Sequence, residues 1–446
     1  MAITVIGAGL AGCEAAWAAA QRGESVTLWE MKPEKYTPAH RQPLFAELVC
    51  SNSLKAQRLG SAAGLLKEEM ARLGSLCVPI ARRCAVPAGG ALAVDRDRFS
   101  AAVTDRIRAH PRITVRQGEV TAIPADGVTV IATGPLTAPS LAEAIAALCG
   151  GALSFYDAAA PIVTADSLDR SRTFCASRYD REESGDGDYI NCPLNKVEYE
   201  AFREALVSAE RAPLHEFDRP PDGQPDGLTV YEGCMPIEVL AARGADAIRY
   251  GPMKPVGLRD PATGHRPWAV LQLRAENAAG TLYNLVGFQT NLKFGEQKRV
   301  FGMIPALKNA EFVRYGVMHR NTFLDAPRLL DAAFRFRQRP ELLFAGQMTG
   351  VEGYVESCAS GFLAGIELAR RLKGQAPLDL PRETAIGALG LYVSNESVAD
   401  FQPMNVNFGI IPPLDHRVKG KRNKNAELSQ RSLAILDTMK EEVLSL

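Results

Sequence analysis

The chain has 446 residues, 46% apolar and 23% charged, which predicts a large core and two or three domains. Its 51 basic and 51 acidic residues cancel, which argues against nucleic-acid binding through bulk charge but still allows a local basic patch. No apolar stretch could span a bilayer, the N-terminus leads straight into a strand without a signal peptide, and the nine cysteines form no C-x-x-C pair. We therefore expect a cytoplasmic protein with no membrane contact, disulfide framework or metal site.

The first thirty residues, through AITVIGAGLAGCEAAWAAAQRGESVTLWE, predict a strand, a glycine loop, an Ala-rich helix and a second strand. Gly7 permits the tight turn, Gly9 lets backbone approach a pyrophosphate, and Gly12 lets the helix pack closely on the strand. A carboxylate about twenty residues past such a loop can bind the ribose hydroxyls of a dinucleotide. The predicted cofactor-binding residues of this segment are Gly7, Ala8, Gly9, Gly12 and Glu30.

The stretch ELVCSNSLKA (47–56) places Cys50 after a short apolar run and before three small polar residues that favour helix caps. We expect a helix to begin here, and a thiol at a helix N-terminus has a lowered pKa. Cys50 is then a candidate nucleophile or base. The alternative, a half-buried cysteine beside an ordinary cap, stays open.

Two later segments favour FAD over NAD as the dinucleotide. Residues 128–135, VTVIATGP, predict a buried strand that ends at Thr133 and Gly134. Residues 341–372 predict a strand running into Gly346 and Gln347, a loop, and a long helix whose N-terminus would face the flavin. An ordinary strand–helix unit with small packing residues is the alternative.

Because these segments come from both chain ends, we predict an α/β protein with a Rossmann-like FAD-binding domain and an inserted α/β substrate domain. The expected boundaries are 1–155 for the first part of the FAD-binding domain, 156–325 for the insertion, and 326–446 for the closing part with a basic C-terminal tail.

A second thiol stands in the same kind of setting. Within VYEGCMPIEVLAARG (230–244), Cys234 lies two residues before a predicted helix that has Pro236 at its first position and Glu238 in its first turn. A small-residue corner explains either cysteine alone, but two such cysteines favour thiol chemistry.

Taken together, the motifs resemble a known family. GAGLAGCEAAWAAA, ELVCSNSLKA, YEGCMPIE, GPMKPVGL, VGFQTNLKFGEQKRVF and GQMTGVEGYVESCASG look like the folate- and FAD-dependent tRNA uracil-C5 methyltransferases. The likeness extends through NFGIIPPL (407–414). A related flavoprotein family that modifies the wobble uridine carries a long extra C-terminal region. This chain ends about 70 residues after its FAD-closing helix, which favours the methyltransferase.

The resemblance implies methylation of uridine 54 in the tRNA T-loop. A thiolate adds at uracil C6, C5 then takes a one-carbon unit from methylenetetrahydrofolate, and reduced FAD gives the hydride. NADH or NADPH would re-reduce the FAD. We assign the C6 nucleophile to Cys234 and the base or flavin-side partner to Cys50, and the reverse assignment stays open.

Further residues are expected at the folate or the target base. Tyr354 could stack on the pterin, or it could be a core tyrosine that caps its loop. Gln289 and Asn291 could hydrogen-bond the pterin or base, and Lys293 could face a glutamate tail or a phosphate.

For RNA, the best candidate is the basic run 416–425, and a second is RYGVMHRNTF (314–323), where Arg314, His319 and Arg320 alternate with aromatic rings. A charged surface loop is the alternative for both, and it is the simpler interpretation for the second. The residues of the first run are Arg417, Lys419, Lys421, Arg422 and Lys424.

Other functions remain possible at this point. They are another flavin-dependent oxidoreductase, a wobble-uridine tRNA modifier, or an RNA-binding protein with a structural FAD. The sequence leaves the oligomeric state open.

Overall fold

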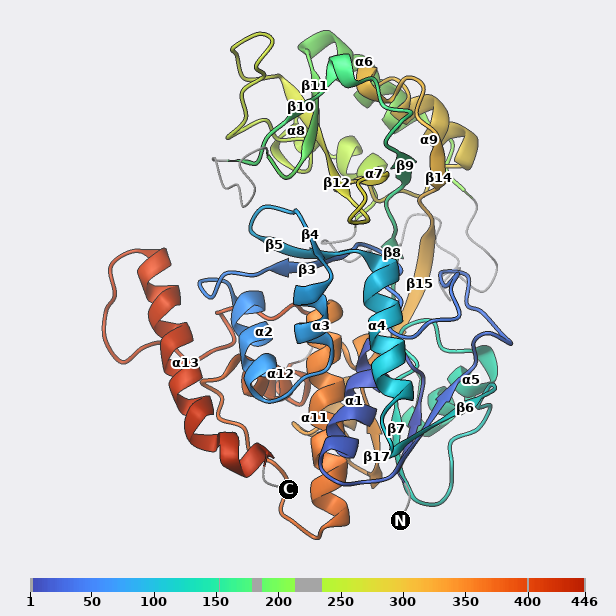
Figure 1. Cartoon of the computed structure of the whole chain (residues 1–446), viewed down its shortest axis with the longest axis vertical. Coiled ribbons are helices and arrows are strands. Elements are labelled where there is room, and N and C mark those ends of the chain that lie inside the picture. The colour runs from blue at the N-terminus through green and yellow to red at the C-terminus, as the bar shows by residue number, and fades with distance from the viewer. Residues whose placement is uncertain (1–2, 152, 179–186, 213–234, 399–400, 445–446) are drawn as a thin grey trace.

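The computed structural model describes residues 3–151, 153–178, 187–212, 235–398 and 401–444. Figure 1 shows two lobes, one above the other. The lower lobe combines the blue N-terminal segments with the orange and red C-terminal ones, and the upper lobe holds the green-to-yellow middle of the chain.

The helices and strands within these ranges have the following bounds. The helices are α1 (Leu10–Gln21), α2 (Ala62–Arg72), α3 (Cys77–Arg83), α4 (Arg96–Arg108), α5 (Pro139–Cys149), α6 (Lys196–Ser208), α7 (Ile237–Ala242), α8 (Ala247–Tyr250), α9 (Phe294–Phe301), α10 (Ala326–Leu329), α11 (Tyr354–Leu372), α12 (Ala385–Val393) and α13 (Lys421–Leu444), with 3₁₀ turns η1 (Arg170–Arg172), η5 (Pro305–Leu307) and η6 (Gln347–Thr349). The strands are β1 (Ile3–Ile6), β2 (Val26–Glu30), β3 (Ser53–Ala56), β4 (Ala85–Val86), β5 (Ala91–Val94), β6 (Ile113–Gln117), β7 (Val128–Ile131), β8 (Leu153–Ala158), β9 (Ile162–Thr164), β10 (Phe174–Cys175), β11 (Ile190–Leu194), β12 (Ala269–Ala275), β13 (Leu282–Leu285), β14 (Phe312–Arg314), β15 (Met318–Phe323), β16 (Arg335–Phe336) and β17 (Arg339–Phe344).

The lower lobe is built on a six-stranded sheet in the order β16-β17-β7-β1-β2-β6. All neighbours from β17 to β6 are parallel, and only β16 runs antiparallel at the edge. Central strand β7 is buried along its whole length, as the apolar sequence VTVI of a parallel strand predicts. Since β17 comes from the C-terminal part and pairs with β7, the Rossmann-like domain is assembled from both chain ends, as expected.

Helices α1 and α11 cover this sheet side by side and touch backbone to backbone (Figure 1). A Cβ built on Gly361 would lie 2.0 Å from the Ala11 carbonyl oxygen, and one on Gly365 would lie 2.3 Å from that of Ala15. Only glycine therefore permits this approach, which fixes where α11 begins.

The upper lobe contains a second six-stranded sheet, in the order β10-β11-β12-β13-β9-β14, with antiparallel pairing throughout. Helices α6, α7 and α9 pack on it around a separate apolar core that includes Phe202, Phe288 and Phe301. The antiparallel pair β8 and β15 connects the two lobes (Figure 1).

The segment after Cys50 differs from the sequence prediction. No helix begins there, because residues 53–56 form β3, which pairs with β5. The side chain of Asn52 donates to the carbonyls of Val94 and Ala275, at 3.0 and 2.9 Å, instead of capping a helix. The polar residues 51–53 therefore stabilise a turn into a strand.

Among the residues that the structure describes, no helix is both long enough and apolar enough to cross a membrane.

We predict that the α1–α11 contact decides the stability of the lower lobe. Gly361→Ala should lower the free energy of unfolding by about 1–3 kcal/mol or more, because the added methyl group overlaps the Ala11 carbonyl. Gly295→Ala is the matched control, since its Cβ would meet nothing within 4 Å and α9 gains helix propensity. Denaturant unfolding of both variants measures this, and an unchanged midpoint for Gly361→Ala would contradict it.

Candidate functional site

The glycine loop between β1 and α1 forms one wall of a cavity that the ends of β2 and β7 also line. Gly7 has φ +97°, and a Cβ there would lie 2.7 Å from the Ala132 carbonyl oxygen. A Cβ on Gly12 would lie 1.7 Å from the Gly7 oxygen, whereas one on Gly9 would meet nothing within 4 Å. Gly9 precedes α1 and no side chain caps that helix, so its N–H groups can receive a phosphate.

Glu30 lines the same cavity at the end of β2. Its carboxylate accepts the N–H groups of Ala8, at 2.9 Å, and Lys32, at 3.0 Å. A carboxylate offers about four acceptor positions, so two remain for the hydroxyls of a ribose. The uncapped helix, the open space at Gly9 and this carboxylate together fit the adenosine and pyrophosphate of a dinucleotide.

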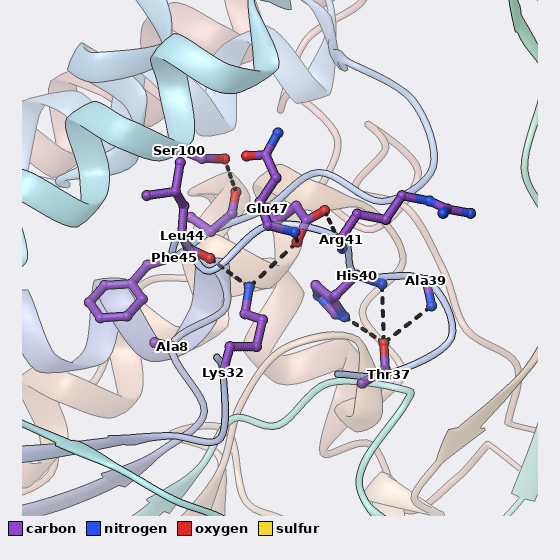
Figure 2. Close-up of polar contacts among 12 residues, drawn as sticks. Ala8, Lys32, Thr37, Ala39, His40, Arg41, Leu44, Phe45, Glu47 and Ser100 are labelled. Atoms are coloured by element: carbon purple, nitrogen blue, oxygen red, sulfur yellow. Dashed lines mark hydrogen bonds and ion pairs between the residues drawn. The ribbon is translucent and has the colours of Figure 1, made fainter. Parts of the chain in front are cut away.

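A loop between β2 and β3 covers this cavity, and Figure 2 shows what holds it. The buried ammonium of Lys32 points at the Leu44 carbonyl, 2.5 Å away, and the Glu47 carboxylate, 3.5 Å away. Glu47 also accepts the backbone N–H groups of Arg41 and Gln42. This lysine thus connects the cofactor side of the loop to the stretch that leads into Cys50.

The other predicted cofactor residues lie around the same loop. Thr133 lines the cavity, and Gly134, with φ +72°, follows it. On the opposite side, a Cβ on Gly346 would lie 3.2 Å from the Ala11 side chain, and the Gly346 N–H donates to Ser360 Oγ. The Gln347 side chain donates to the Glu352 carboxylate.

Cys50 meets the N-terminus of α11. The Tyr354 hydroxyl oxygen accepts the N–H groups of Cys50, at 2.8 Å, and Ser51, at 3.2 Å. The Cys50 sulfur lies 3.8 Å from the Ala158 carbonyl oxygen, at the end of β8. The thiol is therefore placed by the two parts of the lower lobe and by the connection between lobes.

Three arginines from separate elements surround this stretch. The Arg96 guanidinium donates to the carbonyls of Leu48 and Cys50, the latter at 2.9 Å. Arg314 donates to the Val49 carbonyl at 2.5 Å, and Arg274 donates to Asn52 Oδ1 and Ser51 Oγ. We call Arg96, Arg274 and Arg314 the arginine clamp.

The clamp makes the surroundings of Cys50 positive. Burial works to lower the pKa of Arg96, but Glu276, Tyr354 and Cys50 together raise it above its ordinary value. Burial lowers the pKa of Arg314, and Arg96 lowers it further, while Tyr354 and Cys50 act the other way. Since an ionised Cys50 stabilises both guanidinium groups, both stabilise its thiolate in return.

The start of α7 is tied to the same place. The Thr290 N–H donates to the Ala159 carbonyl, next to the carbonyl that faces Cys50. The Gln289 carbonyl accepts the Ile237 N–H at 2.7 Å. Cys234 lies outside the described residues, but Ile237 follows it by three positions in the sequence.

Glu238 fixes this helix start from within. Its buried carboxylate accepts the Thr290 hydroxyl at 2.9 Å and the Asn291 N–H at 2.8 Å. Burial raises the pKa of Glu238, and these hydrogen bonds partly offset the rise. These hydrogen bonds therefore join the first turn of α7 to residues 289–291.

Other polar residues expected at a ligand are engaged within the protein. The Asn291 side chain donates to the Ala212 carbonyl, and Lys293 is exposed and pairs with Glu210 at 2.6 Å. The candidate RNA segment 314–323 has Arg314 turned inward to the Val49 carbonyl and Phe323 buried. Its interpretation as an exposed basic–aromatic surface was therefore wrong for these two residues.

The basic run 416–425 leads into the first turn of α13, and Arg417, Lys419, Lys421, Arg422 and Lys424 are all exposed. The Asn425 side chain donates to the Gly60 carbonyl, and Ser429 Oγ donates to that of Leu59, so the run is held against the loop before α2.

A buried cluster elsewhere has the composition of a metal site. Single ligand atoms of Glu14, Cys77 and Cys358 lie within 4.8 Å of one another. The Glu14 carboxylate accepts Ser75 Oγ and the N–H groups of Leu76 and Cys77. A hydrogen bond with Cys358 and burial raise the pKa of Cys77, and burial raises that of Cys358. Since the Glu14 carboxylate already accepts these three hydrogen bonds and all three side chains are buried, we interpret this cluster as core packing.

The parallel sheet, the glycine loop and the carboxylate at the end of β2 define a dinucleotide-binding protein of the Rossmann-like FAD type. The fold agrees with two solved structures of Aquifex aeolicus GidA. The form II crystal has TM-score 0.72 at 16% identity, covering 100% of this chain and 73% of that one, and the form I crystal has TM-score 0.68 at 17%, covering 99% and 77%.

Sequence comparison identifies the family. The pattern described as "Glucose inhibited division protein A" matches residues 2–376. The methylenetetrahydrofolate–tRNA-(uracil-5-)-methyltransferase TrmFO of Moorella thermoacetica is 58% identical over 434 residues, 97% of each chain. The protein of that name from Symbiobacterium thermophilum is 59% identical over 436 residues, 97% of this chain and 96% of its own. The chain belongs to this methyltransferase family.

Several residues of the site were missed by sequence reasoning. Arg96 and Arg274 lie far from Cys50 in sequence and in no motif that the sequence analysis used. Glu238 was read only as an acidic residue of a first helical turn, although its position four residues after Cys234 could have drawn attention to it.

We predict that the clamp raises the reactivity of Cys50. Arg314→Met should slow alkylation of Cys50 by iodoacetamide at pH 7 by about threefold to tenfold, because losing a nearby positive charge reduces the thiolate fraction. Mass spectrometry of the Cys50 peptide measures the rate. Arg328→Met, at a side chain that is 77% exposed, is the control. Equal rates in wild type and Arg314→Met would contradict the prediction.

Proposed function

We propose that this protein methylates C5 of uridine 54 in the tRNA T-loop, using methylenetetrahydrofolate and FAD. The observation that carries the proposal is the convergence at Cys50 of the FAD-side tyrosine Tyr354, the arginine clamp and the segment that holds the start of α7. The curated relatives, matched along nearly their whole length, bear the name of this activity.

The residues of the chain have distinct tasks in this reaction. Cys234, just before α7, adds as a thiolate to uracil C6, which makes C5 nucleophilic toward the one-carbon unit. Cys50 takes the C5 proton, with the guanidinium groups of Arg96 and Arg314 bound to the carbonyls of Cys50 and Val49 beside it. The clamp also fixes the backbone of residues 48–52, so the base stays aligned. The reverse assignment of the two thiols is tested below.

The cofactor is held by the glycine loop, Glu30, Thr133, Gly134, Gly346 and Gln347. When bound, reduced FAD supplies the hydride that completes the methyl group, and NADH or NADPH restores it. Tyr354 keeps the Cys50 stretch at the flavin end of α11. Gln289, Asn291 and Lys293 border the folate and base side. The backbone N–H of Asn291 and the backbone carbonyl of Gln289 also hold the start of α7.

We take residues 156–325 as the substrate domain between two parts of the FAD-binding domain. The exposed run from Arg417 to Lys424 contributes to tRNA binding by charge. We also propose a cytoplasmic location, which a tRNA substrate and a reaction that needs two reduced thiols support.

The decisive experiment follows 5-methyluridine in a tRNA transcript. The purified, yellow protein should form it only when methylenetetrahydrofolate and NADH or NADPH are both present, because the carbon and the reducing equivalents come from different sources. Labelled carbon from the folate should appear in the product at uridine 54, read by base-resolved mass spectrometry. Product without folate, or at a wobble uridine, would contradict the proposal.

Single variants separate the thiols. Cys234→Ala and Cys50→Ala should each lose at least about 100-fold in methylation and keep FAD, because each removes one chemical step and leaves the residues that line the dinucleotide cavity unchanged. A covalent complex with 5-fluorouridine-containing tRNA should form in Cys50→Ala and not in Cys234→Ala. The opposite pattern would exchange their roles.

We predict that Glu238 positions the start of α7. Glu238→Ala should reduce kcat for methylation by about tenfold or more with FAD content unchanged, because Thr290 and the Asn291 N–H lose their buried acceptor and the start of α7 shifts. Glu204→Ala, a carboxylate on α6 of the same lobe, is the control. Wild-type kcat in Glu238→Ala would contradict it.

A further inference from the structure

Three aromatic rings form a parallel column beside the site. Tyr315 stacks on Phe294 at 4.7 Å between centroids and 15° between planes, and on Phe312 at 5.4 Å and 8°. Tyr315 is therefore the middle ring. Phe312 is in turn 6.5 Å from Phe301, a buried core residue, whereas Phe294 at the other end is 55% exposed. The column begins in the core and ends in solvent.

The column is rigidly attached to residues of the site. Gln297, buried in α9, donates to the carbonyls of Leu292 and Gly316 and accepts the Gly316 N–H. This fixes Phe294, in the first turn of α9, against Tyr315. Tyr315 directly follows Arg314 of the clamp. Figure 1 shows α9 and β14 on one flank of the upper lobe, where β14 leads down into β15.

Exposed basic residues lie near Phe294 in the sequence. Lys293 precedes it, and Lys298 and Arg299 follow on the same helix, all exposed. Lys293 pairs with Glu210 and Arg299 with Glu296, both at 2.6 Å. Exposed ion pairs of this kind contribute little to stability, so a phosphate can displace the carboxylates at small cost.

We propose that the Phe294–Tyr315–Phe312 column is a stacking platform for an unpaired nucleobase of the RNA substrate, which would add a fourth ring on Phe294. This inference rests on the proposed function. An exposed flat ring with basic neighbours suits single-stranded nucleic acid, whose bases stack and whose phosphates carry charge. A pterin suits it less, because in the proposed function the folate acts beside the cofactor, whose cavity lies in the lower lobe.

The test compares Phe294→Ala, Phe294→Tyr and Tyr250→Ala in the full-length, FAD-loaded protein. Tyr250→Ala is matched because Tyr250 is an aromatic residue of the same lobe, 75% exposed. Phe294→Ala should raise both the Kd for a tRNA transcript and the KM for tRNA by about tenfold, the usual scale of one base–aromatic stack. Phe294→Tyr and Tyr250→Ala should behave as wild type. The KM for methylenetetrahydrofolate and the FAD content should not change in any variant.

A spectroscopic measurement reports the stack directly. T-arm RNAs with 2-aminopurine at successive loop positions should include one whose fluorescence is quenched by wild type and by Phe294→Tyr but not by Phe294→Ala. The inference is overturned if Phe294→Ala binds tRNA like wild type, or if only its KM for methylenetetrahydrofolate rises. It is also overturned if the weaker tRNA binding of Phe294→Ala comes with a changed oligomeric state in size-exclusion chromatography. If wild-type protein makes no folate-dependent 5-methyluridine, the proposed function fails, whatever the behaviour of Phe294.

Discussion

The backbone contact between α1 and α11 is the constraint on which the site depends. Gly361 and Gly365 let α11 lie directly against Ala11 and Ala15, so the position of α11 is set by the same helix that follows the glycine loop. Tyr354, the first residue of α11, then reaches the Cys50 stretch with its hydroxyl. One close contact thus relates the dinucleotide cavity to the thiol, although the two helices are more than 300 residues apart in the chain.

Charge at the site is local, because the chain as a whole has no net charge. Burying Arg96, Arg274 and Arg314 near one another costs desolvation energy, and Glu276 is the carboxylate that most offsets it. Arg96 pairs with that carboxylate while also holding two carbonyls of the Cys50 stretch. Concentrating like charges in this way is a poor means of stabilising a fold. It is a good means of stabilising an anion, and in the proposed function that anion is the thiolate of Cys50.

Features that depend on residues close together in the sequence could be predicted well. Gly7, Gly9 and Glu30 have positions that follow from the geometry of one strand–turn–helix unit, and strand β7 could be recognised from its apolar run. The residues around Cys50 could not be predicted in that way. The pattern after it suggested a helix cap, but pairing of β3 with β5 and the long-range bonds of Asn52 determine the turn. Arg314 likewise seemed exposed by its neighbours, and only the pairing of β14 with β9 turns it toward Val49.

The proposed reaction needs two thiols that are distant in the chain to act on one base, and the connection between the lobes supports that proposal. Consecutive carbonyls at the end of β8 face different partners, with that of Ala158 toward the Cys50 sulfur and that of Ala159 toward the Thr290 N–H. Thr290 and Gln289 in turn hold α7, whose start follows Cys234. Helix α13 belongs to the lower lobe and α9, which begins at Phe294, to the upper one, and the two helices lie on opposite flanks in Figure 1. An RNA that contacts both must cross the junction where these carbonyls lie, so binding across the lobes and delivery of a base to the thiols would be the same event.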